Sequence, residues 1–302
     1  MKDRNELLYM VVFGQSDVGL VRENNEDSFL LMDLTGAEKI ALADPVHLVG
    51  RKGSLFLVAD GMGGAEAGEV ASRMAVDLVS LHMSKHLRGR KFLSRQAFVR
   101  SLIKSIEQAN AIIYKESYKN KRHKGMGTTL TGVGVYDGAL FFAQVGDSRG
   151  YLVRNGSITQ MTQDQSLVAH LVASGALSPE EAKIHPQRNV ILQALGVQKR
   201  VDVKISLVEL RRGDWAVLCS DGLSGKVDAE EINGILKGSA GPKEACQQMI
   251  DVAKEKGGED NITVIAAKFD GEKLPLPSPD EAPTYKEFKE EGRSRFWPWR
   301  KR

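Results

Sequence analysis

The sequence predicts an α+β protein in which antiparallel β-sheets pack face to face and helices lie outside them. Short apolar segments typical of strands are numerous between residues 9 and 270, and helical patterns cluster among them. The turns Asp137-Gly138 and Asn155-Gly156 are of types that join neighbouring antiparallel strands. Antiparallel strands with clustered helices favour sheet on sheet over a parallel α/β arrangement.

The expected elements follow from runs of apolar residues and from apolar residues spaced three or four apart. Strands are expected at residues 55–59, 129–136, 139–145, 150–154, 215–220 and 261–269. Helices are expected at residues 68–87, 95–119, 166–174 and 242–256. The third helix is short and is followed by Gly175, Pro179 and Pro186, so we interpret this part as a surface excursion.

Composition narrows the classes of function. The chain has 302 residues, of which 42% are hydrophobic and 27% charged, so it can bury a sizeable core. The net charge of +3 is scattered and gives no basic stripe for nucleic acid. Two distant cysteines, Cys219 and Cys246, indicate a reducing compartment and no disulfide framework. No leader pattern and no run of ~18 apolar residues is present, so we expect a cytoplasmic protein.

The composition changes after Asp270. Four of the nine prolines fall within residues 275–283, which indicates an extended linker. We therefore expect a folded domain at residues 9–270 and a Pro-rich linker with a basic aromatic tail at residues 271–302. The last ten residues carry five Lys or Arg, two Trp and no acid, and such a tail can contact an anionic membrane surface or a partner protein. The alternative is a disordered solubilising tail.

Four aspartates stand at the ends of predicted strands. Asp60, Asp147 and Asp221 follow apolar strands, whereas Asp260 precedes one. If the last strand is antiparallel to its neighbours, its start lies beside their ends, and all four carboxylates converge on one edge. Such a cluster is costly unless cations neutralise it, and oxygen ligands favour Mg²⁺ or Mn²⁺. The alternative for each Asp-Gly pair alone is an ordinary turn.

Two further segments fit a phosphate and metal site. Arg22 precedes Glu26 and Asp27, and its planar guanidinium matches phosphate oxygens. The alternative for this arginine is a solvated ion pair. The glycines of residues 61–64 lack the Gly-Lys-Ser/Thr ending of a nucleotide loop. They would let the backbone pass close to a metal, so that the carbonyl of Gly61 joins its ligands.

Taken together, these segments resemble the metal-dependent Ser/Thr protein phosphatases of the 2C type, and most closely the bacterial branch. The match covers roughly residues 12–270. It rests on blocks in the family's order at residues 16–27, 58–64, 125–130, 145–151, 218–223 and 258–263. The resemblance implies a four-layer sandwich of two antiparallel sheets flanked by helices.

The resemblance also implies a metal centre of two Mn²⁺ or Mg²⁺ ions. Asp60 would bridge the two ions, and the Gly61 carbonyl would bind one of them. Asp221 and Asp260 would complete the shell of the other. Asp147 matches a position that helps to bind a third metal in bacterial relatives, with Asp221 shared.

Further roles are implied around that centre. Glu26 and Asp27 would act through metal-bound water, and Arg22 would hold the substrate phosphate. Residues 163–196 correspond to a flap beside the active site. The reaction implied is hydrolysis of phosphoserine and phosphothreonine in proteins by a metal-activated water, opposing a Ser/Thr kinase.

Two positions depart from the wider family pattern. Animal members often carry a histidine directly after the Asp-Gly pair, proposed as the general acid, whereas this chain has Met62, as bacterial members commonly do. A thioether cannot donate a proton. Ala65 also stands where many relatives have His. Two alternatives to a protein phosphatase stay open: a catalytically inactive fold that binds phosphoproteins, and a hydrolase of small phosphoesters.

Overall fold

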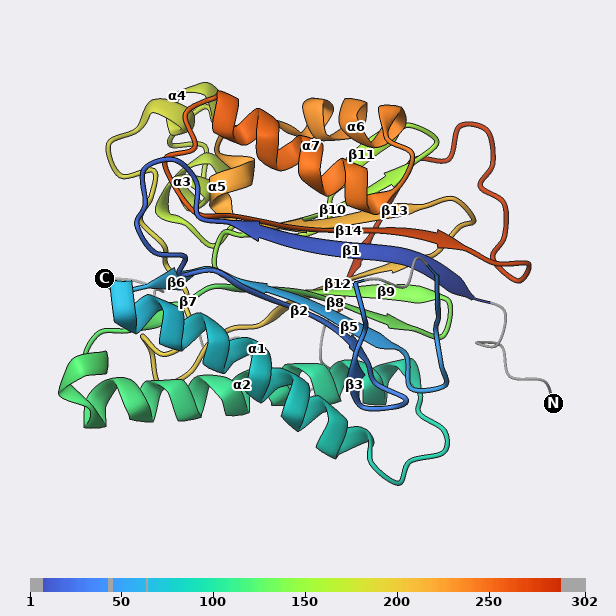
Figure 1. Ribbon diagram of the computed structural model, residues 1–302, viewed down its shortest axis with the longest axis horizontal. Helices are drawn as coiled ribbons and strands as arrows, with labels where there is room; N and C mark the ends of the chain where they lie inside the picture. The colour runs from blue at the N-terminus through green and yellow to red at the C-terminus, as the bar shows by residue number, and fades with distance from the viewer. Residues whose placement is uncertain (1–7, 43–45, 64, 289–302) are drawn as a thin grey trace.

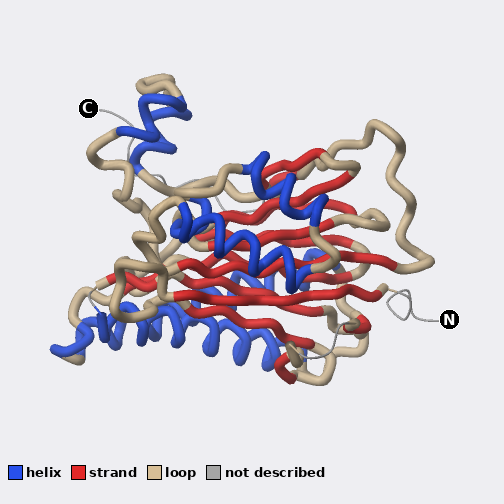
Figure 2. The backbone as a smooth tube through the Cα atoms, turned by 45° about the horizontal axis from the view of Figure 1, so that its top comes forward, coloured by secondary structure: helices blue, strands red, loops and turns tan. Residues whose placement is uncertain are grey.

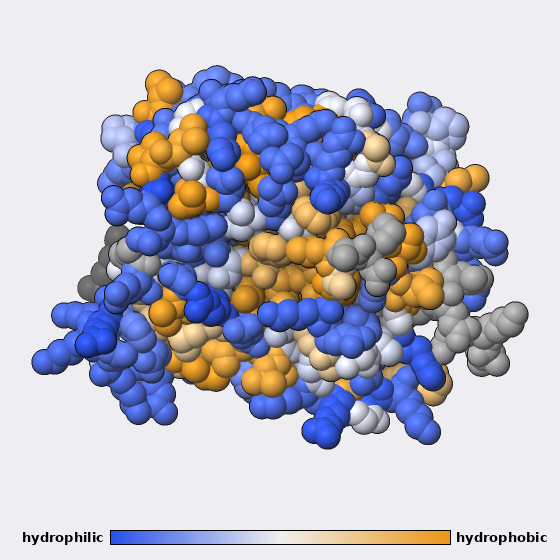
Figure 3. Space-filling model, in the orientation of Figure 1, coloured by the Kyte–Doolittle hydropathy of each residue, from blue (hydrophilic) through white to orange (hydrophobic). Residues whose placement is uncertain are grey.

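The computed structural model describes residues 8–42, 46–63 and 65–288, and it is built of four layers (Figure 1). Two antiparallel sheets pack face to face in the middle, and helices cover the outer face of each. The predicted α+β sandwich is confirmed. In Figure 3 the outer layers are largely hydrophilic, and apolar residues show mainly in the band between them.

The first sheet has six strands in the order β11-β10-β13-β14-β1-β4. Every neighbouring pair is antiparallel. Its strands are β1 (Tyr9–Asp17), β4 (His47–Leu48), β10 (Arg149–Arg154), β11 (Ser157–Gln160), β13 (Trp215–Cys219) and β14 (Ile262–Asp270). The central pair β13 and β14 carries two of the predicted acidic residues at its ends.

The second sheet has seven strands in the order β15-β12-β9-β8-β5-β2-β3, also antiparallel. Its strands are β2 (Ser28–Asp33), β3 (Glu38–Lys39), β5 (Ser54–Ala59), β8 (Leu130–Tyr136), β9 (Ala139–Val145), β12 (Lys204–Glu209) and β15 (Lys286–Glu287). A separate two-stranded sheet joins β6 (Gly61–Met62) to β7 (Gly127–Thr128).

The helices fall into two covering groups and one excursion. α1 (Ala65–Leu87) and α2 (Arg95–Lys119) lie on the seven-stranded sheet, and the short helix η1 (Lys121–His123) follows α2. α5 (Asp221–Ser224), α6 (Ala229–Gly238) and α7 (Pro242–Glu255) lie on the side of the six-stranded sheet. α3 (Leu167–Ala173) and α4 (Pro179–Ile184) bury no residue and project beyond the sheets, as expected for a surface excursion (Figure 2).

Alternation along the strands divides the core into layers. In β5, Leu55 and Leu57 pack with the α1–α2 side, whereas Phe56 and Val58 pack between the two sheets. Successive side chains of a strand point to opposite faces, so a fully apolar strand supplies both layers. A third apolar cluster joins the six-stranded sheet to α6 and α7. The sandwich therefore holds both sheets rigidly, and their ends can carry a site.

The segment after Asp270 differs from a free linker. Leu274 is buried with the core between the sheets, and β15 pairs with β12 at the sheet edge. The carboxylate of Glu281 lies 2.8 Å from Arg154, whose side chain is 3% exposed, and 2.9 Å from Arg211. Because a buried guanidinium needs a counter-charge, this contact ties the segment down. As far as Phe288, the expected linker is therefore packed against the domain.

Two expectations about the membrane concern different parts of the chain. The basic aromatic tail lies within residues 289–302, outside the described residues. Over the described ranges, every helix is too short or too polar to cross a bilayer.

Candidate metal centre

The strand-end aspartates gather at one end of the sandwich, on the left in Figure 1. β5 ends directly before Asp60, β9 two residues before Asp147, and β13 two residues before Asp221. β14 runs antiparallel to β13, with Val264 opposite Cys219, so Asp260 lies at the same end. The two sheets thus bring four acidic residues together, as the strand pattern predicted.

The electrostatics of Asp60 show how close this convergence is. Burial raises the pKa of Asp60 well above its usual value, and the charges of Asp221, Asp27 and Asp147 raise it further. The neighbouring Asp221 carboxyl group raises the pKa of Asp60 by its charge and as a hydrogen-bonding partner, so the two side chains lie close together. Burial also raises the pKa of Asp221, and Asp260 adds to the effect. The ionised forms of Asp60 and Asp221 are therefore both disfavoured at this end of the sandwich.

Burial also disfavours the ionised form of two more carboxyl groups at this end. Burial raises the pKa of Asp27 to about 7, and that of Asp147 also to about 7, with the charge of Asp221 contributing to both. The Oδ1 atom of each is buried and has no hydrogen-bond partner in the described structure. Buried carboxylate oxygens without donors are costly unless a cation takes the donor's place. This donor set fits hard divalent cations such as Mn²⁺ or Mg²⁺.

The side chains do not form a closed cage. Within the described ranges, no three His, Cys, Asp or Glu side chains form a group arranged to hold a metal ion. Asp260 is paired with Arg22, whereas Asp60 and Asp221 lie close enough to raise each other's cost of ionisation.

Asp27 is fixed by the neighbouring sheet. The Ser220 hydroxyl donates to Asp27 Oδ2 at 2.7 Å, and the Thr263 amide donates to that same hydroxyl oxygen at 2.9 Å. Ser220 therefore joins β2, which begins at Ser28, to the ends of β13 and β14. One Asp27 oxygen is held in this way, and the unpartnered oxygen is the one left for a cation or water.

Glu26 and Gly61 meet the start of α1 in a tight space. A Cβ atom at Gly61 would overlap the carbonyls of Gly68 and Glu26, and a Cβ at Gly68 would overlap the Glu26 carboxylate. Glycine is required here because the backbones approach closely. Burial raises the pKa of Glu26, while the charge of Arg22 lowers it. Gly61 and Glu26 are thus brought beside the end of the sandwich where the strand-end aspartates gather. We call this end the acidic edge; its residues are Asp60, Asp147, Asp221 and Asp260.

Arg22 lies at the same end but is already paired. Its guanidinium donates to Asp260 Oδ2 at 2.9 Å, and both side chains are about half exposed. The hydrogen bond to Asp260 and its charge raise the pKa of Arg22. The arginine therefore stands at the rim of the acidic edge, where a phosphate can reach it.

Several polar residues that hold the acidic edge were not singled out from the sequence. Thr129 Oγ1 accepts from the Asp60 amide at 3.0 Å, and Thr128 Oγ1 donates to the Asp60 carbonyl at 2.8 Å. The Ser148 hydroxyl lies 2.8 Å from that of Thr129. Hydroxyl-bearing residues beside each acidic strand end were the available signal. Ser220, Thr128 and Thr129 fix the backbone from which the aspartates project.

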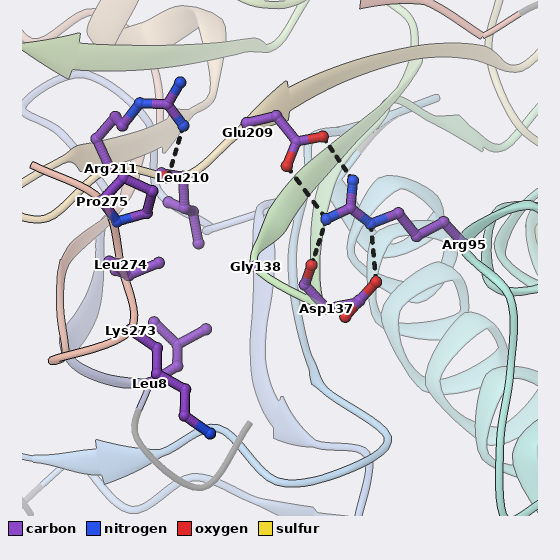
Figure 4. A pocket seen from close by; sticks show the side chains of 10 residues that line it. All are labelled: Leu8, Arg95, Asp137, Gly138, Glu209, Leu210, Arg211, Lys273, Leu274 and Pro275. Atoms are coloured by element: carbon purple, nitrogen blue, oxygen red, sulfur yellow. Dashed lines mark hydrogen bonds and ion pairs between the residues drawn. The ribbon is translucent and has the colours of Figure 1, made fainter. Parts of the chain in front are cut away.

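A cavity lies at the opposite end of the sandwich, away from the strand-end aspartates. It measures about 420 Å³ and is lined partly by Leu8, Leu274 and the Asp137-Gly138 turn between β8 and β9 (Figure 4). Arg95 is held there by Asp137 and by Glu209. The charge of Arg95 is balanced there by two carboxylates, and the buried carboxyl oxygens that lack partners in the described ranges lie at the acidic edge, which remains the candidate centre.

A sandwich of two antiparallel sheets with buried carboxylates and an arginine at one end fits a metal-dependent phosphatase, and comparison with known proteins gives the same class. A family model described as protein phosphatase 2C matches residues 37–263. A serine/threonine phosphatase stp of Listeria monocytogenes is 36% identical over 256 residues, which span 85% of this chain and 94% of that protein.

Solved structures agree with this match. The Streptococcus agalactiae serine/threonine phosphatase aligns with a TM-score of 0.74 at 33% identity, covering 85% of this chain and 98% of the other. The catalytic domain of the phosphatase PstP, in complex with two manganese ions, aligns with a TM-score of 0.70 at 34% identity, covering 87% and 99%. The chain belongs to the protein phosphatase 2C family.

Proposed function

We propose that this chain hydrolyses phosphoserine and phosphothreonine in proteins at the acidic edge, with two Mn²⁺ or Mg²⁺ ions. The observation that carries the proposal is the convergence of Asp60, Asp221, Asp27 and Asp147, two of them with a buried oxygen that has no partner. The Mn²⁺ complex of PstP supports the choice of metal. When bound, such ions lower the pKa of water and offset the charge of a phosphoryl group.

The chain's own residues would divide the work as follows. Asp60 and Asp221 would hold the ions from the two sheets, with the Gly61 carbonyl on one ion and Asp260 on the other. Asp147 would contribute to a third ion. Glu26 and Asp27 would orient water molecules by accepting hydrogen bonds from them.

Arg22 would bind the phosphate of the substrate. Its guanidinium is anchored by Asp260 and is about half exposed, so it can present donors to phosphoryl oxygens. Met62 follows Gly61 and has no proton to give, so the leaving alkoxide would take its proton from a metal-bound water or from a group elsewhere in the site. This makes proton delivery independent of any side chain at position 62.

Three wider points belong to the same proposal. The catalytic domain would span residues 9–270 with a flap at 163–196. For the tail at 293–302, contact with an anionic membrane surface or a partner protein and a merely solubilising role are the two alternatives. The substrates would be phosphorylated proteins, and the opposing enzyme a Ser/Thr kinase. Both cysteines are free and buried, which suits a reducing compartment such as the cytoplasm.

The test compares a phosphothreonine peptide with a small chromogenic phosphoester, each with Mn²⁺ and after chelation. We expect turnover of both with Mn²⁺, a higher kcat/KM for the peptide, and loss of both after chelation. Failure to hydrolyse either substrate with Mn²⁺ bound would favour an inactive phosphoprotein-binding fold. Turnover of the small ester alone would identify a small-molecule hydrolase.

A further inference from the structure

Asn261 has every polar group of its side chain engaged with one loop. Its Nδ2 donates to the Val18 carbonyl at 3.0 Å and to the Asn24 carbonyl at 2.9 Å. Its Oδ1 accepts from the Glu26 amide at 2.8 Å. The residue is 5% exposed. A buried amide with three such bonds specifies the position of its partners, because any displacement leaves buried polar groups unpaired.

The loop that Asn261 holds is the one between β1 and β2. This loop carries the exposed Arg22 and the partly buried Glu26, and it leads into Asp27. The bonds of Asn261 fall on both sides of Arg22. Residues 18–26, which we call the arch, are therefore held by the Asn261 side chain on both sides of Arg22.

The opposite side of this contact is the segment 258–261, which ends in Asp260 and Asn261. The Leu20 amide donates to the Gly258 carbonyl at 2.7 Å. Gly19 has a φ of 81° and lies so close to the Asp260 carbonyl that a Cβ would overlap it. The arch therefore lies directly on the backbone of Asp260, and Arg22 bonds to the carboxylate of the same residue.

We propose that Asn261 is a positioning residue that sets Arg22 in register with Asp260. This inference rests on the proposed function, because Arg22 acts there as the phosphate ligand. Asn261 itself contacts neither phosphate nor cation. Its effect on the reaction passes through the arch and is therefore visible only while Arg22 is present.

The chemistry of the contact is specific to asparagine. Aspartate has the same shape but no donor, so it would set a negative charge against the Val18 and Asn24 carbonyls. Serine is shorter and supplies one donor in place of two. Asn261→Ser tests the positioning with little loss of volume, and Asn261→Asp tests the two donors.

The experiment is a double-mutant cycle of Asn261→Ser and Arg22→Ala in the full chain with Mn²⁺. We measure kcat and KM for a phosphothreonine peptide and the Kd for inorganic phosphate. Misplacing the arch by about 1 Å should lower kcat/KM and phosphate affinity about tenfold or more. In the Arg22→Ala background the same change should cost less than about twofold, because contacting residues are not additive. Asn261→Asp should give a loss at least as large as Asn261→Ser.

The matched control is Asn233→Ser on α6. Asn233 is also buried, and its Nδ2 donates to the Gly156 carbonyl at 2.7 Å, away from the acidic edge. We expect this variant to lower the Tm while leaving KM and phosphate affinity unchanged. Equal losses from Asn261→Ser with and without Arg22, together with a lowered Tm, would reduce Asn261 to a structural residue.

The two proposals fail in different ways. If the wild-type chain binds phosphate but turns over no substrate, the proposed function is wrong, and the cycle in phosphate Kd still decides the role of Asn261. If substrate is turned over and the Asn261→Ser and Arg22→Ala effects are additive, the positioning role is wrong and the proposed function stands.

Discussion

Replacing Asp147 with asparagine should stabilise the protein when no metal is present. Burial and the charges of Asp221 and Asp164 raise the pKa of Asp147 from 3.8 to about 7. At about 1.4 kcal/mol per pKa unit, ionising this group inside the fold costs about 4 kcal/mol above pH 7. An amide of the same shape carries no charge but needs acceptors, which costs about 1–3 kcal/mol. We expect a net gain of about 2 kcal/mol at pH 8 for Asp147→Asn.

The pH dependence gives the sign of the effect. Because the folded-state pKa lies above the unfolded one, the folded protein binds more protons between pH 4 and pH 7. The wild-type stability contributed by this group is therefore lost as the pH rises through about 7. The gain of Asp147→Asn should be largest at pH 8 and should mostly disappear at pH 5.

Thermal unfolding of chelated protein at pH 5 and pH 8 measures this gain. About 2 kcal/mol corresponds to a Tm increase of about 4–8 °C at pH 8 for a domain of this size. Saturating Mn²⁺ should raise the Tm of wild type more than that of the variant. Asp77→Asn, at an exposed position on α1, is the control and should change stability by less than about 0.5 kcal/mol. A lowered Tm of metal-free Asp147→Asn at pH 8 would refute the reasoning, because the carboxylate would then be stabilising.

Other perturbations test the remaining parts of the structure. Asp221→Asn should abolish Mn²⁺-dependent stabilisation and lower kcat about a thousandfold, as for loss of a main electrostatic group; activity near wild type would remove it from the site. Arg22→Ala should raise the KM for a phosphopeptide about tenfold or more, through lost charged hydrogen bonds, and an unchanged KM would exclude phosphate binding. Burial raises the pKa of Cys219 to about 12, so the thiol should not be alkylated in the folded protein at pH 8. Mass spectrometry of the treated protein measures this. A chain ending at Asp270 should lose several degrees of Tm because residues 271–288 pack on the domain, whereas an unchanged Tm would make them a free linker.

The sequence was sufficient for strands that are buried on both faces. β8 and β9 are entirely buried and are joined by the Asp137-Gly138 turn, so their apolar runs and turn residues agree. β1 was missed because Gly14 interrupts its pattern. That glycine lies against the Phe29 ring, where a Cβ would overlap it, and such a contact is visible only in three dimensions.

Helix α6 was missed for a related reason. Its ten residues include Gly234 and Gly238, which lower helix propensity. The signal that was present is the capping box, in which the Asp228 carboxylate accepts from the Glu231 amide and Glu231 accepts from the Asp228 amide. The proline-rich segment after Asp270 likewise has an extended composition, but its packing depends on partners such as Arg154 far earlier in the chain.

The convergence of the acidic residues could be predicted because it needs only strand ends and antiparallel pairing. Asp60 and Asp221 follow strands, Asp260 precedes one, and the pairing of β13 with β14 brings them together. The polar residues that hold the site could not be predicted in this way. Ser220 reaches Asp27 across 193 positions of sequence, and no local pattern encodes that contact.

The central claim is that the clustered carboxylates exist to bind divalent cations. The most direct measurement is a crystal structure of the full chain grown with Mn²⁺, with anomalous scattering used to locate the ions. We predict two strong anomalous peaks at the acidic edge. Asp60 should lie within coordinating distance of both ions, and Asp221 should be among the other ligands. The absence of any anomalous peak within coordinating distance of Asp60 and Asp221 in Mn²⁺-soaked crystals would contradict the metal centre.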